Sequence, residues 1–131
     1  MTMLSIIAPL ALFAQAAPPA DETALEAAEP VSLETLDLEQ AAALRCAVAI
    51  ALVNGWQKDG DERGAAYPAQ PEEGAREFFV RTMARLMDER GLDRRAVFDL
   101  VALQFNQFEE RPETVEEIMP ACLMMKRSAG L

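Results

Sequence analysis

The stretch AAALRCAVAIALV, residues 41–53, decides the fold of this protein of 131 residues. Its small and aliphatic side chains follow one another almost without interruption. That pattern predicts a helix that is buried on most sides and that neighbouring helices approach closely. Within it stand one base, Arg45, and one of the two cysteines of the chain, Cys46. We expect this helix to be the central one.

The signals at the ends of this helix are local. Asp37 and Gln40 have the spacing of a capping box, in which each side chain binds the backbone N–H of the other residue. Asn54-Gly55 is typical of a helix end, because glycine takes the left-handed conformation without strain. The sequence therefore predicts a helix from about residue 37 to residue 55, which is too short to cross a bilayer.

Three further segments have apolar residues at helical spacing, and none alternates as a strand does. They cover residues 72–90, 93–110 and 112–127. The first two are joined by a short connection, so we expect them to lie antiparallel. Pro112 opens the last helix, and Pro120 is expected to kink or divide it. The predicted apolar stripes are Phe79, Met83, Leu86 and Met87 with Phe78 beside them, then Val97, Leu100, Val101, Phe105 and Phe108, then Val115, Ile118, Met119, Cys122 and Met125. The fold class is all-α, a small four-helix domain over residues 37–131.

The N-terminal part has a different composition. The first 20 residues carry no charge, and their apolar stretch runs into Ala14-Gln15-Ala16, the small-x-small pattern of a signal cleavage site. We expect residues 1–16 to be a signal peptide, with an uncleaved membrane anchor as the alternative. Residues 17–36 combine prolines, alanines and acids, which predicts an acidic disordered linker. The cleaved protein is then periplasmic or secreted, with no stable membrane span.

Cys46 and Cys122 each fall on an apolar stripe, one in the first helix and one in the last. In an exported protein with two cysteines, a single disulfide joining the first helix to the last is the most economical interpretation. A buried pair of free thiols is the alternative. A redox-active pair is disfavoured, because the cysteines lack the CxxC spacing that tunes a reactive thiol.

Arg45 has three interpretations. In the first, its aliphatic stem extends over apolar neighbours and its charge reaches solvent. Alternatively it is buried against an acid such as Asp99, Glu116 or Glu117, or it receives an anionic ligand. The sequence does not choose between them.

Enzymatic chemistry finds little support. Histidine is absent, and with it the side chain most used for proton transfer near neutral pH. The chain has no GxSxG, HExxH or glycine-rich phosphate-binding motif. Adjacent acids such as Glu109-Glu110 point in different directions from a helix, so they do not form a general acid–base pair. We expect a protein that is not an enzyme and that has no cofactor.

The connection after the first helix resembles a calcium loop only in part. Asp59, Asp61 and Gly64 match the first, third and sixth positions of an EF-hand loop. Arg63 and Gln70, however, stand where ligands are needed. We interpret this segment as an ordinary surface loop with no metal.

The formal net charge is −10. Seven of the 22 acidic residues fall between Asp21 and Glu39, where no lysine or arginine occurs, and the rest of the chain is nearly balanced. An acidic protein repels the phosphates of nucleic acids and anionic lipids. Nucleic acid is therefore excluded as a partner.

Aromatic and methionine side chains are the candidates for an interaction surface. Such residues fill helical cores, and they also line adaptable grooves for a peptide or a lipid. Trp56 and Tyr67 flank the loop after the first helix, where they either anchor the loop to the core or mark a contact surface. A Cu(I) site on Met119, Met124 and Met125 is the metal alternative. The candidate surface residues are Trp56, Tyr67, Phe78, Phe79, Met83, Met87, Met124 and Met125.

The segment YPAQPEEGAREFFVRTMARLMDERGLDRRAVFDLV, residues 67–101, together with RCAVAIALV before it and MPACL after it, resembles small exported two-cysteine helical proteins of alphaproteobacteria. The resemblance covers about residues 40–125. It implies a pairing of Cys46 with Cys122, and it implies no catalytic residue, because that family has no assigned activity. The architecture is also similar to that of periplasmic acid-stress chaperones, although no motif is shared.

These observations predict a non-enzymatic exported protein that holds a protein or lipid partner, in a chaperone-like or other interaction role. The alternative from a different class is a copper carrier or an enzyme built on carboxylates.

Overall fold

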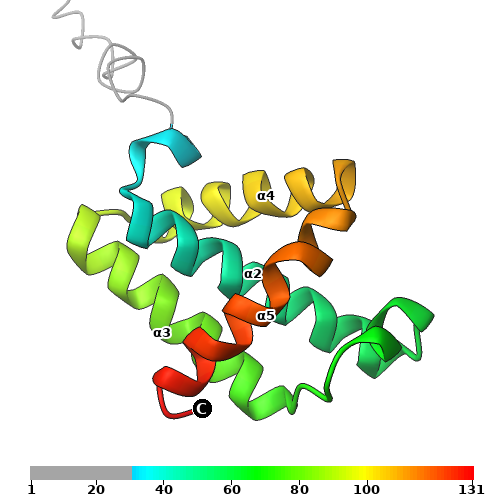
Figure 1. Ribbon diagram of the computed structural model, residues 1–131. Helices are drawn as coiled ribbons and strands as arrows, with labels where there is room; N and C mark the ends of the chain where they lie inside the picture. The colour runs from blue at the N-terminus through cyan, green and yellow to red at the C-terminus, as the bar shows by residue number, and fades with distance from the viewer. Residues whose placement is uncertain (1–30) are drawn as a thin grey trace, which may run out of the picture.

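The computed structural model describes residues 31–131, which form four α-helices and two short 3-10 helices without a strand (Figure 1). The predicted all-α, four-helix class is confirmed. The predicted signal peptide, residues 1–16, and the linker up to residue 30 lie outside the described residues. The elements are η1 (Leu33–Thr35), α2 (Leu38–Asp59), η2 (Glu62–Ala66), α3 (Glu72–Arg90), α4 (Arg94–Glu110) and α5 (Glu113–Ser128).

The helix α2 is the centre of the domain, and α3, α4, α5 and η2 all pack against it (Figure 1). Leu44, Ile50 and Val53 are completely buried. Burial of a side chain of this size stabilises the fold by about 1.5–3 kcal/mol. Ala47 and Ala49 are also fully buried, and their small side chains let the neighbouring helices come close.

The start of α2 follows the prediction, and its end does not. The carboxylate of Asp37 accepts from the backbone N–H of Gln40 at 2.8 Å, and the Asp37 N–H donates to the Gln40 side chain at 3.2 Å. The helix then continues past Gly55 and ends at Gly60, whose φ of 71° is left-handed. The predicted end at Gly55 is wrong, because residues after it bind the following loop and keep the helix intact.

This extension makes α2 longer than predicted, which bears on whether it could cross a bilayer. Among the described helices, α2 alone is long and apolar enough, at 22 residues, to span a bilayer by length and composition. The prediction that it is too short was therefore wrong. In this domain the other three helices pack around it.

Short local signals fix the remaining helices. Gly91 ends α3 with a φ of 61°, and the carboxylate of Asp93 accepts from Ala96 N–H at 2.8 Å at the start of α4. The predicted ends of α3 and α4 are confirmed. Pro120 lies inside α5, which continues undivided to Ser128.

The buried faces of two helices are rotated slightly from the predicted stripes. On α3, Phe78 is buried and Phe79 only partly so. On α4, Gln104 takes the buried position between Leu100 and Phe108, at spacings of four residues. Val101 and Phe105 consequently lie at the edge of the core, where they line a cleft.

The predicted disulfide is confirmed. Cys46 of α2 and Cys122 of α5 are bonded, with Cα atoms 4.9 Å apart and both side chains buried. The domain also includes residues before its predicted start at Asp37, because Leu36 is buried in the core.

Candidate functional site

An open cleft lies between α3 and α4. The two helices diverge from their short connection, and α2 lies between them (Figure 1). Two hollows, of about 350 and 680 Å³, occupy this space and meet at Phe79 and Val101, which line both. We call the combined space the α3–α4 cleft. Its narrow end is near the α3–α4 connection, and its wide end is near η2.

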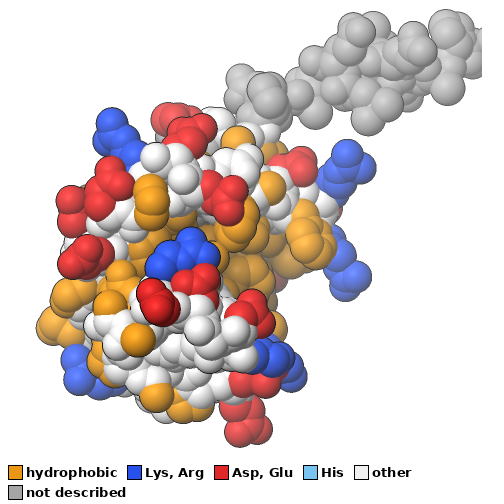
Figure 2. All heavy atoms as spheres, turned by 90° about the vertical axis from the view of Figure 1, so that its right-hand side faces the viewer, with side chains coloured by type: hydrophobic (Ala, Val, Ile, Leu, Met, Phe, Trp, Pro, Cys, Tyr) orange, Lys and Arg blue, Asp and Glu red, His pale blue; other side chains and the backbone are white. Residues whose placement is uncertain are grey.

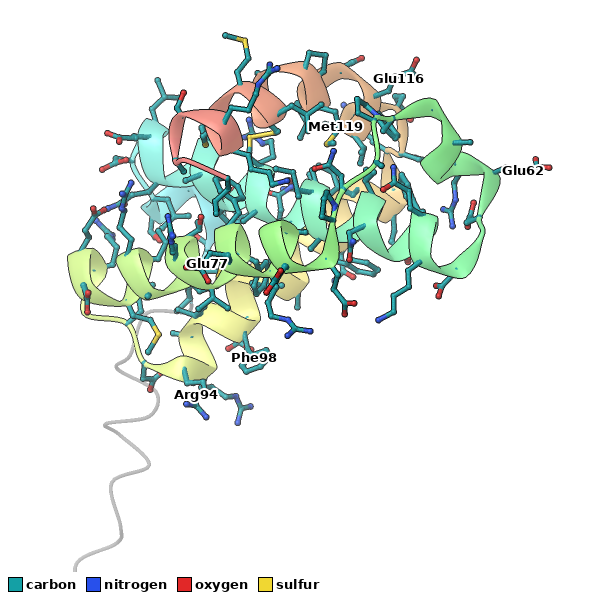
Figure 3. All side chains as sticks on the ribbon, turned by 90° about the horizontal axis from the view of Figure 1, so that it is seen from below. Glu62, Glu77, Arg94, Phe98, Glu116 and Met119 are labelled. Atoms are coloured by element: carbon teal, nitrogen blue, oxygen red, sulfur yellow. A yellow bond between two sulfur atoms is a disulfide. The ribbon has the colours of Figure 1, made fainter. Side chains whose placement is uncertain are left out.

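The narrow end is almost purely apolar. Phe98 is 66% exposed and Val80 is 53% exposed, an unusual position for side chains of this size. Figure 3 shows Phe98 pointing away from α4, close to Arg94, the one charged residue that lines this end. The other apolar lining residues are Met83, Ala84, Met87 and Val97.

The floor of the wide end belongs to α2, and it includes a glycine in a helix interior. Gly55 lies beside Ala51 and Leu52 there. A Cβ atom added to Gly55 would meet no atom within 4 Å apart from its chain neighbours and the backbone of its own helix, so no packing contact requires glycine at this position. Glycine in a helix interior costs about 1 kcal/mol relative to alanine. The sequence therefore keeps this part of the floor open at a cost in stability.

One edge of the wide end is an ordered polar corner. The guanidinium of Arg63 lies over the ring of Trp56. The ring of Tyr67 stacks on Trp56, with the two ring centroids 6.5 Å apart. Arg63 also binds the Asp61 carboxylate, with contacts of 2.6 to 3.1 Å. These hydrogen bonds from the Arg63 side chain and backbone hold the pKa of Asp61 at about 2. Arg63 is thus already engaged by its own neighbours.

The loop that carries this corner is anchored by Gln57. Its amide donates to the carbonyl oxygens of Gly64 and Pro68, each at 3.0 Å, and its oxygen accepts from Gln70 N–H at 2.7 Å. Gly64 packs so tightly that an added Cβ would lie 2.8 Å from the Gln57 backbone nitrogen. The stacked rings of Trp56 on α2 and Tyr67 in the loop add a further contact between the two.

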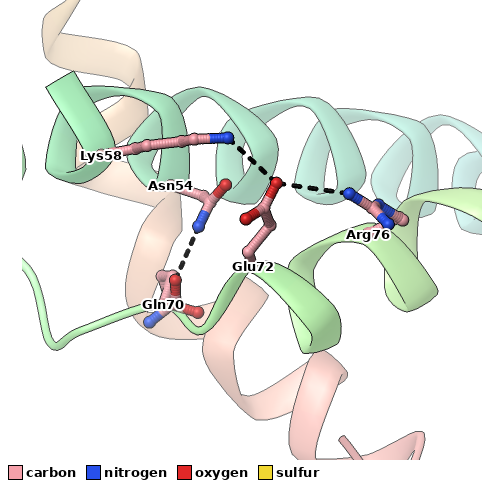
Figure 4. Close-up of polar contacts among 5 residues, drawn as sticks. All are labelled: Asn54, Lys58, Gln70, Glu72 and Arg76. Carbon is pink, nitrogen blue, oxygen red and sulfur yellow. Dashed lines mark hydrogen bonds and ion pairs between the residues drawn. The ribbon is translucent and has the colours of Figure 1, made fainter.

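The start of α3 is fastened to α2 as well (Figure 4). Glu72 accepts from Lys58 at 3.0 Å and from Arg76 at 3.3 Å, and these two cations lower the pKa of Glu72. The amide of Asn54 donates to the Gln70 carbonyl oxygen at 2.7 Å. These contacts hold the wall of the cleft that contains Phe79.

The predicted surface residues divide into two groups. Trp56, Phe79, Met83 and Met87 line the α3–α4 cleft. The other four do not: Tyr67 stacks behind Trp56, Phe78 is buried, Met124 is 63% exposed on α5, and Met125 is half-buried. Phe78 and Met125 instead line a separate hollow of about 360 Å³ between α2, α3 and α5.

The remaining candidates are placed as follows. Arg45 is exposed and makes no ion pair within residues 31–131, so its charge reaches solvent. Met119 is buried whereas Met124 is exposed, so these two thioethers lie on different faces of α5. Within the described part of the chain, no three His, Cys, Asp or Glu residues are grouped to hold a metal ion. Asp61, the second acid of the calcium-like pattern, is bound to Arg63.

Several residues of the cleft are not predicted by the sequence patterns. Val80 and Phe98 fall outside the apolar stripes, on helix faces that are otherwise charged. A large apolar residue on a charged face indicates an exposed contact surface, so these two residues could have been found from the sequence. Gly55 was interpreted only as a helix end. Asp59 and Glu109 line the wide end, and nothing in their local sequence relates one to the other.

Comparison with models of protein families, with curated proteins and with solved structures finds no match. The resemblance to exported alphaproteobacterial proteins remains a prediction.

Proposed function

We propose that this protein is a non-enzymatic, exported interaction protein whose α3–α4 cleft holds an apolar segment of a protein or lipid partner. The observation that carries the proposal is the gathering of exposed Val80, Phe98 and Phe105 along one open cleft. Contiguous apolar surface of this kind marks interaction sites in soluble proteins. The open floor at Gly55 gives further support.

Export is part of this proposal. A disulfide between Cys46 and Cys122 is compatible with an oxidising compartment, such as the periplasm or the medium. The test is the intact mass of protein purified from its host envelope without reductant. We expect a chain that begins at Ala17 and is two hydrogens lighter than the reduced form. A full-length reduced protein would contradict export.

Binding is measurable without a label, because Trp56 is the only tryptophan in the chain and lines the cleft. The probes are a neutral amphipathic helical peptide and vesicles of zwitterionic phosphatidylcholine. We expect a saturable change in Trp56 emission with at least one of them. Replacing Phe98 and Val80 by serine should weaken binding by about tenfold or more, because each side chain loses its apolar contact with the probe.

The matched control is Met124→Ser, which removes an equally exposed apolar side chain from α5, outside the cleft. We expect it to bind as the unmodified protein does. Equal affinity of all three proteins, or no response to either probe, would contradict the proposal.

A further inference from the structure

We propose that the α3–α4 cleft binds an amphipathic α-helix of a partner protein, with the basic end of that helix over Asp59 and Glu109. This inference rests on the proposed function and specifies its partner. It follows from the charges at the two ends of the cleft.

The wide end carries an excess of acid. Asp59, Asp61 and Glu109 line it, against one base, Arg63. Arg63 is engaged by Asp61 and by the ring of Trp56. Asp59 and Glu109 make no ion pair within residues 31–131. Two carboxylates therefore remain free to bind a cation from outside.

These acids face an apolar space. Figure 2 looks at this end of the molecule and shows a hollow of hydrophobic side chains, with a basic side chain over its middle and acidic side chains beside and around it. The hydrogen bond to Asp61 is the main cause that raises the pKa of Arg63, and the Glu109 carboxylate adds a smaller contribution, so α4 and the η2 corner lie within electrostatic reach of each other across the opening. A base entering the wide end would thus meet Glu109 on α4 and Asp59 at the end of α2, while Asp61 neutralises Arg63.

The narrow end has the opposite charge. Arg94 lines it and makes no ion pair among the described residues. Arg94 and Glu109 are the first and the penultimate residue of the same helix, so about 22 Å of α4 separates them at 1.5 Å per residue. The cleft is therefore a long apolar surface with a base at one end and acids at the other.

This pattern fits a helix better than a lipid. A partner helix of about four turns covers that length, and its apolar face lies in the groove while its charged ends meet the two rims. A lipid has a single headgroup, and an anionic bilayer is repelled by a protein whose net charge is −10. The complementary partner is a helix with bases at one end and acids at the other.

The experiment uses two helical peptides with the same apolar face, titrated against Trp56 emission of the oxidised protein. One has lysines at one end and glutamates at the other, and the second has glutamines at all those positions. We expect the charged peptide to bind about fivefold more tightly at low salt, with the advantage shrinking as salt is added. A nitroxide on the lysine end should quench Trp56, and one on the glutamate end should not.

The variant D59N/E109Q should reduce the advantage of the charged peptide to the part that Arg94 contributes at the narrow end. Its matched control is E116Q/E117Q, which changes the net charge equally at two exposed acids of α5 that do not line the cleft, and which should keep the advantage. If both peptides bind equally, the charge inference is overturned while the cleft function stands. If the protein binds phosphatidylcholine vesicles and neither peptide, the partner is a lipid and the helix proposal is overturned. If it binds none of the probes, both proposals are overturned.

Discussion

The guanidinium carbon of Arg63 lies 4.5 Å from the centre of the Trp56 ring, and the same guanidinium binds both carboxylate oxygens of Asp61. One cation thus joins an aromatic side chain of α2 to an acid at the start of η2. This contact lies at the only tryptophan of the chain, which lines the wide end of the α3–α4 cleft, so fluorescence reports on that end.

Acid should disturb this corner at an unusually low pH. The folded pKa of Asp61 is about 2, below its ordinary value of 3.8. A depressed carboxylate pKa means that the contact is complete above about pH 4 and is lost as the pH falls through about 2. We expect Trp56 emission to change with a midpoint near pH 2 and to lose this transition in Asp61→Asn. A midpoint near pH 4, with helix content unchanged by circular dichroism, would contradict the assignment.

Reduction of the disulfide should remove a large part of the stability. Cys46 and Cys122 are 76 positions apart. In the chain-entropy model, opening a loop of this length costs roughly 4–5 kcal/mol. Urea unfolding with and without reductant, followed by circular dichroism, measures the difference on an unmodified sequence. A loss below about 1 kcal/mol would show that the reduced unfolded chain is already constrained.

Two glycines should respond in opposite directions to the same change. Gly55→Ala should stabilise the protein by up to about 1 kcal/mol, because alanine favours the helix and its methyl group meets open space. Gly64→Ala should destabilise it, because the methyl group would collide with the backbone of Gln57. Urea midpoints of the two variants provide the comparison. Destabilisation by Gly55→Ala would mean that other residues pack against this position in the floor of the cleft.

Lys126 should depend on Gln70 for its burial. The Lys126 ammonium donates to the Gln70 side-chain oxygen at 3.2 Å, and both residues are more than nine-tenths buried. Gln70→Ala leaves a buried cation without this acceptor and should lower the free energy of unfolding by about 1–3 kcal/mol.

A double-mutant cycle separates this effect from lost packing. Lys126→Met keeps the length of the side chain without the charge, so adding Gln70→Ala to it should cost less than in the unmodified protein. Equal costs in the two backgrounds would show that the hydrogen bond contributes nothing to stability.

The helices and their caps were predictable because their signals are local. Asp37 with Gln40, Gly91 and Asp93 each act within a few residues, and the structure uses all of them as expected. The disulfide was predictable because the chain has two cysteines, both on apolar stripes. Tertiary contacts decided the rest.

The end of α2 was missed because Gln57 binds a loop that follows it, which overrides the local signal of Gly55. Which of Phe78 and Phe79 is buried on α3 depends on the direction from which α2 approaches. Two adjacent phenylalanines do not indicate that direction. The cleft arises from the divergence of two helices and involves Asp59 and Glu109, which are far apart in the sequence. No local pattern contains that relationship.

The disulfide between α2 and α5 also determines how the protein responds to cleavage by a protease. Both walls of the cleft, α3 and α4, lie in the part of the chain between the two cysteines. A single cut in the connection between those walls leaves both fragments in one covalent molecule, each attached through its own cysteine. The binding surface can therefore outlast a nick that would separate the fragments of an uncrosslinked bundle.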